Sequence, residues 1–143
     1  NLHTFYTGMS RDATKLLEVQ KKRSVANNSN LLKIRHQAEN LFDLIKNDRF
    51  SIKEFGQLLE DGWKMKKELS DQVTNKFIED AYIIGKKKGA YGGKLSGAGG
   101  GGFLSFVIQK KLKNILIKSL IRKKLKYFPV NLDSSGSVII SKN

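Results

Sequence analysis

The stretch Gly92-Gly93-Lys94-Leu95-Ser96-Gly97-Ala98-Gly99-Gly100-Gly101-Gly102-Phe103 decides how the chain is interpreted. Small residues allow a backbone to approach a ligand closely, and successive amide N–H groups can hold an anion. The stretch is not a Walker A loop, because Leu95 follows Lys94. It is not a dinucleotide-binding fingerprint, because the glycines precede a predicted strand. A flexible linker is the alternative, although linkers rarely lead directly into a buried strand. We therefore expect residues 85–102 to form an anion-binding loop.

The segments around this loop alternate between strand-like and helix-like patterns. Aromatic and β-branched residues predict strands, and apolar residues three or four positions apart predict helices. The mixed order, with few strands, indicates an α+β fold with helices on one face of a small antiparallel sheet. The predicted strands are 2–7, 103–108, 126–130 and 138–140, and the predicted helices begin at Ser10, Leu31, Ser51, Ser70 and Lys110.

The start of the helix after Ser51 is the most specific local signal. Ser51-Ile52-Lys53-Glu54 is a capping box, in which the serine hydroxyl accepts a hydrogen bond from the glutamate amide. Phe50 and Phe55 occupy the positions of a hydrophobic staple. We expect this helix to continue to Leu69.

Composition limits the function classes that remain. The 143 residues suffice for one domain, and 39% apolar residues can fill its core. Without cysteine, a disulfide scaffold, cysteine-ligated zinc and a thiol nucleophile are excluded. His3 and His36 have no metal-binding spacing. No apolar run is long enough to span a bilayer and no secretory signal is visible, so we expect a cytoplasmic protein without membrane partners.

The net charge of +14 is unevenly distributed. Residues 81–143 carry 13 basic side chains and one acidic side chain, Asp133. This asymmetry is typical of proteins with an anionic partner, such as a nucleic acid, a membrane surface or a phosphorylated small molecule. The alternative is a lysine-rich composition that only maintains solubility.

Three segments in order resemble the GHMP kinases, the galactokinase, homoserine, mevalonate and phosphomevalonate kinase family. Residues 94–103 resemble the family's C-terminal glycine-rich motif, and the four glycines before Phe103 are most similar to the branch that includes heptose 7-phosphate kinases and fucokinases. Residues 6–13 resemble that branch's Tyr-Thr-Gly-x-Ser-Arg segment. Residues 62–70 resemble its Trp-x-x-Lys-Lys-x-Leu-Ser helix.

The resemblance implies one ferredoxin-like C-terminal domain over residues 1–143, with four to five helices on one face of its sheet. The family's N-terminal phosphate loop and acidic residue are not found in the sequence. We therefore expect this chain to be the C-terminal lobe of a two-lobe kinase, inactive alone, with its own N-terminal lobe as partner. ATP and Mg²⁺ would be bound mainly by that lobe, and a homodimer is left open.

By resemblance, this lobe would hold the substrate, with D-glycero-D-manno-heptose 7-phosphate as the first choice and fucose and mevalonate-type alcohols as alternatives. Lys94 and Arg11 suit a phosphate, and their alternative role is exposed surface charge. Thr7 can bind a substrate hydroxyl, whereas Ser10 fits a helix cap better. The candidate substrate- and phosphate-binding residues are Thr7, Arg11, Lys94, Gly97, Ala98, Gly99, Gly100, Gly101 and Gly102.

Several residues are expected to be structural, and two other functions remain open. Trp63 and Met65 fit packing better than a sugar platform, His3 fits a structural role, and His36 fits a solvated helix face. One rival function is a basic nucleic-acid or anion-binding module, although no RNP, KH or helix-turn-helix signature is present. The other is a sensor that retains the kinase fold without catalysis.

Overall fold

A four-stranded antiparallel sheet forms the centre of the molecule, in the order β2-β3-β1-β4. The structure, a computed structural model, describes residues 1–10, 14, 18, 21, 28–47, 49–131, 133 and 135–137. The strands are β1 (Leu2–Tyr6), β2 (Ala90–Ser96), β3 (Phe103–Ile108) and β4 (Lys126–Phe128). Strand β1, the first of the chain, lies between β3 and β4, so it pairs with strands that are about 100 or more residues away in the sequence.

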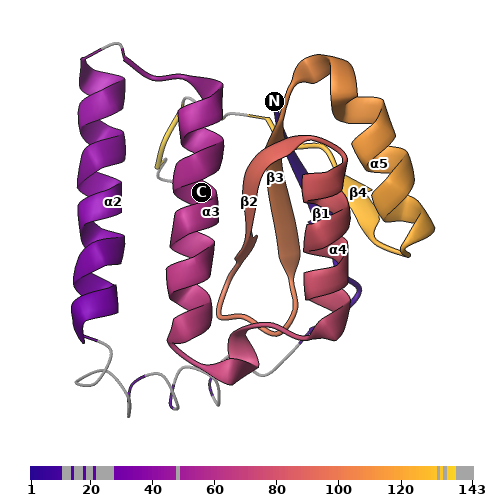
Figure 1. The fold of residues 1–143 in the computed structure, drawn as a ribbon, viewed down its shortest axis with the longest axis horizontal. Coiled ribbons are helices and arrows are strands. Elements are labelled where there is room, and N and C mark those ends of the chain that lie inside the picture. Colours follow the sequence, from indigo (N-terminus) through magenta and orange to yellow (C-terminus); the bar gives the residue numbers. More distant parts are fainter. Residues whose placement is uncertain are drawn as a thin grey trace, which may run out of the picture.

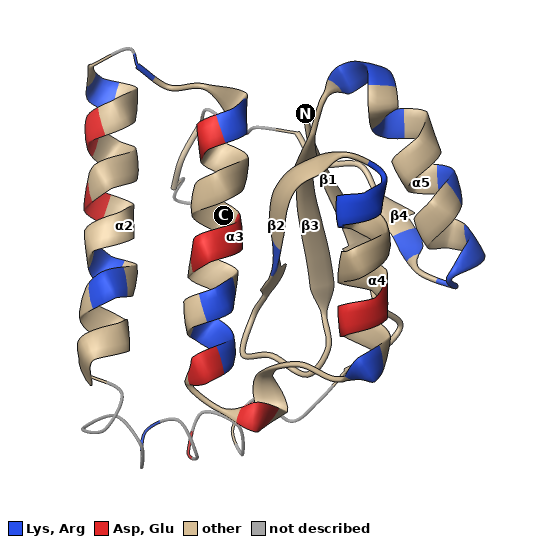
Figure 2. Ribbon diagram, in the orientation of Figure 1, with Lys and Arg blue, Asp and Glu red and all other residues tan. Residues whose placement is uncertain are grey.

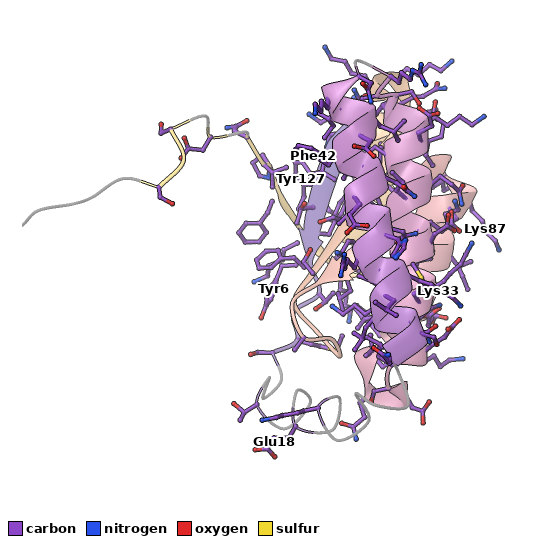
Figure 3. All side chains as sticks on the ribbon, turned by 90° about the vertical axis from the view of Figure 1, so that its left-hand side faces the viewer. Tyr6, Glu18, Lys33, Phe42, Lys87 and Tyr127 are labelled. Atoms are coloured by element: carbon purple, nitrogen blue, oxygen red, sulfur yellow. The ribbon has the colours of Figure 1, made fainter. Side chains whose placement is uncertain are left out.

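The described helices lie on one side of this sheet, and no described helix covers its other side (Figures 1 and 3). α2 stands outside α3, farthest from the sheet (Figure 1). This arrangement confirms the predicted α+β class. The helices are α2 (Asn28–Lys46), α3 (Ile52–Glu68), α4 (Lys76–Lys87) and α5 (Lys113–Arg122), with 3₁₀ turns η1 (Asp71–Val73) and η2 (Lys110–Leu112).

The hydrophobic core lies between the sheet and helices α3, α4 and α5. Alternate strand residues face the helices, so Phe5, Leu104 and Phe106 are fully buried. Trp63 is 1% exposed and belongs to this core, as predicted. The other fully buried large side chains are Ile78, Leu95, Ile108, Leu116, Leu120, Leu125, Val73 and Val107.

The predicted start of α3 is confirmed. The Glu54 amide donates to Ser51 Oγ at 3.1 Å, and the Ser51 hydroxyl donates to the Glu54 carboxylate at 2.6 Å. The Phe50 and Phe55 rings are 5.5 Å apart, as a hydrophobic staple requires. This start fixes the direction in which α3 runs toward the glycine-rich segment.

The prediction that residues 85–102 form a loop is wrong for residues 85–87, which end helix α4, and for residues 90–96, which form strand β2. The reason for the strand is tertiary packing, which compensates for the low strand propensity of glycine. A Cβ on Gly92 would lie 1.9 Å from the carbonyl oxygen of Gly56 in α3. A Cβ on Gly56 would lie 2.4 Å from Cβ of Tyr91. Glycine at both positions therefore lets α3 pack directly on the backbone of this edge strand.

The predicted helix start at Ser70 is also wrong. The Ser70 side chain caps the 3₁₀ turn η1, and α4 begins at Lys76 after its cap Asn75. The Ile78 amide donates to Asn75 Oδ1 at 3.0 Å. Both Ser70 and Asn75 are good helix caps, so the local pattern alone does not distinguish a single turn from a full helix.

The remaining differences concern element boundaries. α2 begins at Asn28, before the predicted Leu31, and the predicted helix over 110–124 divides into η2 and α5. The helix predicted after Ser10 and the strand predicted at 138–140 lie outside the described residues. Across the described ranges, no helix is long and apolar enough to cross a bilayer.

Candidate functional site

The loop Gly97–Gly102 joins β2 to β3 at the end of the sheet where α3 ends and α4 begins (Figure 1). Four of its glycines have positive φ values, including +92° at Gly97 and +126° at Gly99. Residues with a Cβ rarely adopt this backbone conformation, so the loop requires glycine at these positions. The loop lies beside the segment that follows β1, as the next contacts show.

Thr7 and Met9 hold the C-terminal end of the loop. The Thr7 amide and hydroxyl both donate to the Gly102 carbonyl at 2.9 Å. The Gly102 amide contacts Met9 O at 3.0 Å and Thr7 Oγ1 at 3.1 Å. A Cβ on Gly101 would lie 2.6 Å from Met9 O, so the two backbones touch. Thr7, which is only 3% exposed, thus anchors the loop.

The start of α4 holds the middle of the loop. The Gly100 amide donates to Val73 O at 2.7 Å, and Asn75 Nδ2 donates to Gly100 O at 3.2 Å. Asn75 therefore caps α4 and binds the loop with the two ends of one amide group. This places the positive end of the α4 dipole next to the loop, which favours an anion there.

Two lysines lie at the N-terminal end of the loop. The Lys66 ammonium group, from the last turn of α3, donates a hydrogen bond to the Gly97 carbonyl. Lys94, in β2, is close enough that its charge affects Lys66. Burial lowers the pKa of Lys66, and the positive charge of Lys94 lowers it further. A blue stretch of β2 beside the blue lower turns of α3 marks this region in Figure 2.

The loop offers hydrogen-bond donors to an anion. The amides of Ala98, Gly99 and Gly101 donate to no other backbone carbonyl in the described ranges, and of these three residues Ala98 is partly exposed whereas Gly99 and Gly101 are buried. Together with the nearby lysines and the start of α4, they favour phosphate oxygens. Among described residues, no three His, Asp or Glu side chains converge as metal ligands.

The structure brings together most of the predicted site residues. Lys94 and all six residues from Gly97 to Gly102 lie in or directly before the loop, and Thr7 contacts it. Arg11 lies outside the described residues. His3 is buried, with its Nδ1 atom 3.2 Å from the Tyr127 hydroxyl, and His36 is exposed on α2, both as expected.

Sequence reasoning missed two residues that hold the loop, Lys66 and Asn75. Lys66 lies in a helix with many charged residues and resembles an ordinary solvated lysine. Its position in the segment 62–70 was the available signal, because that segment already resembled a kinase motif. Asn75 is a good helix cap three residues before an apolar position, which could have marked the start of α4.

The face of the sheet away from the helices carries an aromatic cluster next to the loop. It consists of Tyr6, Phe103 and Phe128, from β1, β3 and β4. The Phe103 ring lies 5.3 Å from Tyr6 and 5.5 Å from Phe128. Phe103 is 40% exposed and Phe128 is 45% exposed. Figure 3 shows Tyr6 on the side of the sheet away from the helices.

Comparison with known proteins gives a relative consistent with this geometry. A curated D-glycero-alpha-D-manno-heptose 7-phosphate kinase of Campylobacter jejuni is 35% identical over 125 residues. The match covers 81% of this chain and 34% of the relative, so the chain spans about a third of that relative's length.

Solved structures share the fold at lower sequence identity. L. major mevalonate kinase, in complex with R-mevalonate, matches with a TM-score of 0.73 and 18% identity, over 88% of this chain and 41% of its own. Streptococcus pneumoniae phosphomevalonate kinase, in complex with phosphomevalonate and AMPPNP, matches with a TM-score of 0.73 and 13% identity, over 87% and 37%. The family model for the GHMP kinases C terminal matches residues 26–126, which include α2 to α5 and the glycine loop. This chain therefore belongs to the GHMP kinase C-terminal family.

Proposed function

We propose that residues 1–143 are the C-terminal lobe of a cytoplasmic kinase that transfers a phosphoryl group from ATP to a hydroxyl of D-glycero-D-manno-heptose 7-phosphate. The observation that carries this proposal is the 35% identity to the Campylobacter jejuni heptose 7-phosphate kinase over most of the chain. Fucose and mevalonate-type alcohols are the second candidates, since the fold is shared with mevalonate kinases. The net charge of +14 suits substrates that carry phosphate.

In this proposal the glycine loop binds phosphate oxygens at the wall of the cleft. The amides of Ala98, Gly99 and Gly101 supply hydrogen bonds, and the missing side chains allow close approach. Lys94 and Arg11 bind a phosphate of the substrate. Thr7 fixes the loop through Gly102, which orients the amides before substrate arrives.

ATP and Mg²⁺ are expected to be bound mainly by an N-terminal lobe. Phosphoryl transfer depends on positioning and on neutralising the phosphate charge. The loop supplies the positioning, and it supplies no carboxylate for a metal. The role of this lobe is therefore to hold substrate and to close the cleft.

We propose that the N-terminal lobe packs on the aromatic cluster of Tyr6, Phe103 and Phe128. The cluster is continuous with the loop, because Phe103 directly follows Gly102. A lobe on this face would place the loop at the edge of the interface, where a cleft forms. Phe128→Ser should lower the melting temperature of the two-lobe kinase more than that of the 143-residue chain, where it removes only the ring contacts with Tyr6 and Phe103. Equal shifts in both proteins would contradict this placement.

The test is a phosphorylation assay on the two-lobe kinase with ATP and Mg²⁺. The panel contains D-glycero-D-manno-heptose 7-phosphate, sedoheptulose 7-phosphate, L-fucose, galactose and mevalonate. We expect selective turnover of the manno-heptose phosphate. Selective turnover of fucose or mevalonate would retain the kinase and replace the substrate, and no turnover would refute the kinase proposal. The 143-residue chain alone is expected to be inactive, and activity in it would refute the assignment of ATP to the other lobe.

A further inference from the structure

Three of the six partly buried lysines among the described residues pair with a carboxylate. Such pairs join distant elements and compensate the cost of removing charge from water. Lys66, Lys94 and Lys113 are partly buried as well, and none of them lies within ion-pair distance of an acidic group in the part of the chain that is described. The paired lysines are Lys67 with Glu79 at 3.1 Å, Lys86 with Glu60 at 2.5 Å and Lys123 with Asp80 at 3.1 Å.

The fold brings two of these three lysines, Lys66 and Lys94, close together. Lys66 comes from the end of α3 and Lys94 from β2, and the charge of Lys94 disfavours the charged form of Lys66. Like charges in a partly buried region oppose folding unless an anion neutralises them. Lys66 donates to the Gly97 carbonyl, which leaves further N–H groups of its ammonium for a ligand.

A cavity of about 220 Å³ lies at this position, lined by Lys66 and Lys94. Pockets that hold a whole organic ligand typically have about 300–1,000 Å³, so this smaller cavity suits a part of a ligand, such as one phosphate group. The rest of the lining is mainly apolar, which strengthens the attraction between an anion and the two lysines. The other lining residues are Ile34, Gln37, Ala38, Leu41, Leu58, Leu59 and Gly62.

We propose that Lys66 and Lys94 together bind the phosphate monoester that the sugar substrate already carries, and that Lys66 determines specificity for phosphorylated sugars. This inference rests on the proposed function and adds Lys66 to it. Two ammonium groups balance a phosphate monoester, whose charge at pH 7 is about −1.5 to −2. The loop amides of Ala98 and Gly99 lie beyond Gly97 and remain free for the phosphoryl group in transfer.

The test measures kcat and KM of the two-lobe kinase for the sugar phosphate and for ATP. Lys66→Met and Lys94→Met should each raise KM for the sugar phosphate by about 10- to 100-fold, because each removes a charge-assisted hydrogen bond. KM for ATP should stay within twofold or so of wild type. The control is Lys64→Met, on the same helix but exposed and paired with Asp61, which should change neither constant.

Conservative variants of Lys66 distinguish a role of its charge in substrate binding from a role of its hydrogen bond in supporting the loop. Lys66→Arg should recover most of the affinity, because it retains the charge. Lys66→Gln retains a donor for Gly97 but no charge, so it should behave like Lys66→Met. Recovery by glutamine and not by arginine would overturn the inference, because it would assign Lys66 a purely structural role.

Other outcomes decide between phosphate sources. A rise in KM for ATP with an unchanged KM for the sugar phosphate would overturn the inference and assign the lysines to the nucleotide. Unchanged constants in both lysine variants would overturn it as well.

If wild-type kinase phosphorylates no sugar phosphate, the proposed function fails. Calorimetric titration with heptose 7-phosphate then decides: binding lost in Lys66→Met/Lys94→Met supports the site, and binding that persists overturns it.

Discussion

The two halves of the glycine-rich segment use the same amino acid for different physical reasons. Gly92 lies in strand β2, where an added Cβ would collide with the backbone of α3 at 1.9 Å. Gly97 lies in the loop, where an added Cβ meets nothing within 4 Å but φ is +92°. The first glycine permits packing, and the second permits a backbone conformation. Glycine content therefore does not show which part of the segment is a loop.

Gly92→Ala should have the largest effect on stability. The added methyl group meets backbone atoms of Gly56, which cannot rotate away, so α3 must separate from β2. We expect a loss of about 3 kcal/mol or more in the free energy of unfolding. Thermal unfolding followed by circular dichroism measures it. The control is Gly62→Ala in α3, the helix that contains Gly56. There the atom nearest to the added Cβ belongs to the side chain of Gln37, which can move. A wild-type melting temperature for Gly92→Ala would contradict the packing role.

Gly97→Ala should preserve the fold and impair the loop. The strain of a left-handed alanine is about 1–2 kcal/mol, and no collision adds to it. We expect the backbone at this position to relax to relieve the strain, which moves the neighbouring amide groups out of their positions. We expect kcat/KM of the two-lobe kinase to fall by roughly tenfold or more, as for lost oxyanion-type donors. Full activity together with the expected loss of stability would show that the loop amides do not take part in the reaction.

Substitutions at Asn75 separate the helix cap from the loop contact. Asn75→Ala removes both, so the free energy of unfolding should fall by about 1 kcal/mol. Asn75→Asp retains the cap but replaces the donor to Gly100 with a carboxylate. Stability should then stay near wild type, while KM for the phosphorylated substrate rises because of charge repulsion. Denaturant unfolding and steady-state kinetics measure the two effects. Equal kinetics for Asn75→Asp and wild type would contradict the role of this contact.

The smallest effect is expected at His3, in the sheet and away from the loop. Burial lowers the pKa of His3 below the ordinary value of 6.5, and the charge of Lys113 contributes. The unfolded chain therefore binds a proton first as the pH falls, so stability should decrease below about pH 6.5. Unfolding of wild type and His3→Gln at pH 8 and pH 5.5 should differ in this decrease. His36→Gln, on an exposed face of α2, is the control and should retain the decrease.

The sequence correctly predicted the helix start at Ser51, which depends on interactions between residues close together in the chain. The capping box at Ser51 and the staple of Phe50 and Phe55 involve neighbours within five residues, and both were correct. The strand β2 could not be predicted in the same way. Its glycines are favourable only because α3 packs against them, and this contact is between residues more than 30 positions apart.

The candidate site was predicted in its residue types and less well in its geometry. The glycine loop follows from the motif at 94–103, and its contacts with Thr7 link segments far apart in the sequence. The partners Lys66 and Asn75 depend on where α3 ends and α4 begins, which the sequence left uncertain. Lys66 and Lys94 come close together because residues 90–96 form strand β2. Since this strand was not predicted, the proximity of the two lysines was missed as well.

Helix α2 has a consequence for how the molecule opens. It contains no buried residue, and no member of the hydrophobic core cluster comes from it. α4, by contrast, buries Ile78, Ala81, Tyr82 and Gly85. Amide hydrogens of α2 should therefore exchange with solvent through local opening, at a much lower free energy than those of α4. Since α2 also lines the cavity beside Lys66, this opening would give the phosphate that we propose there a route in and out while the core remains folded.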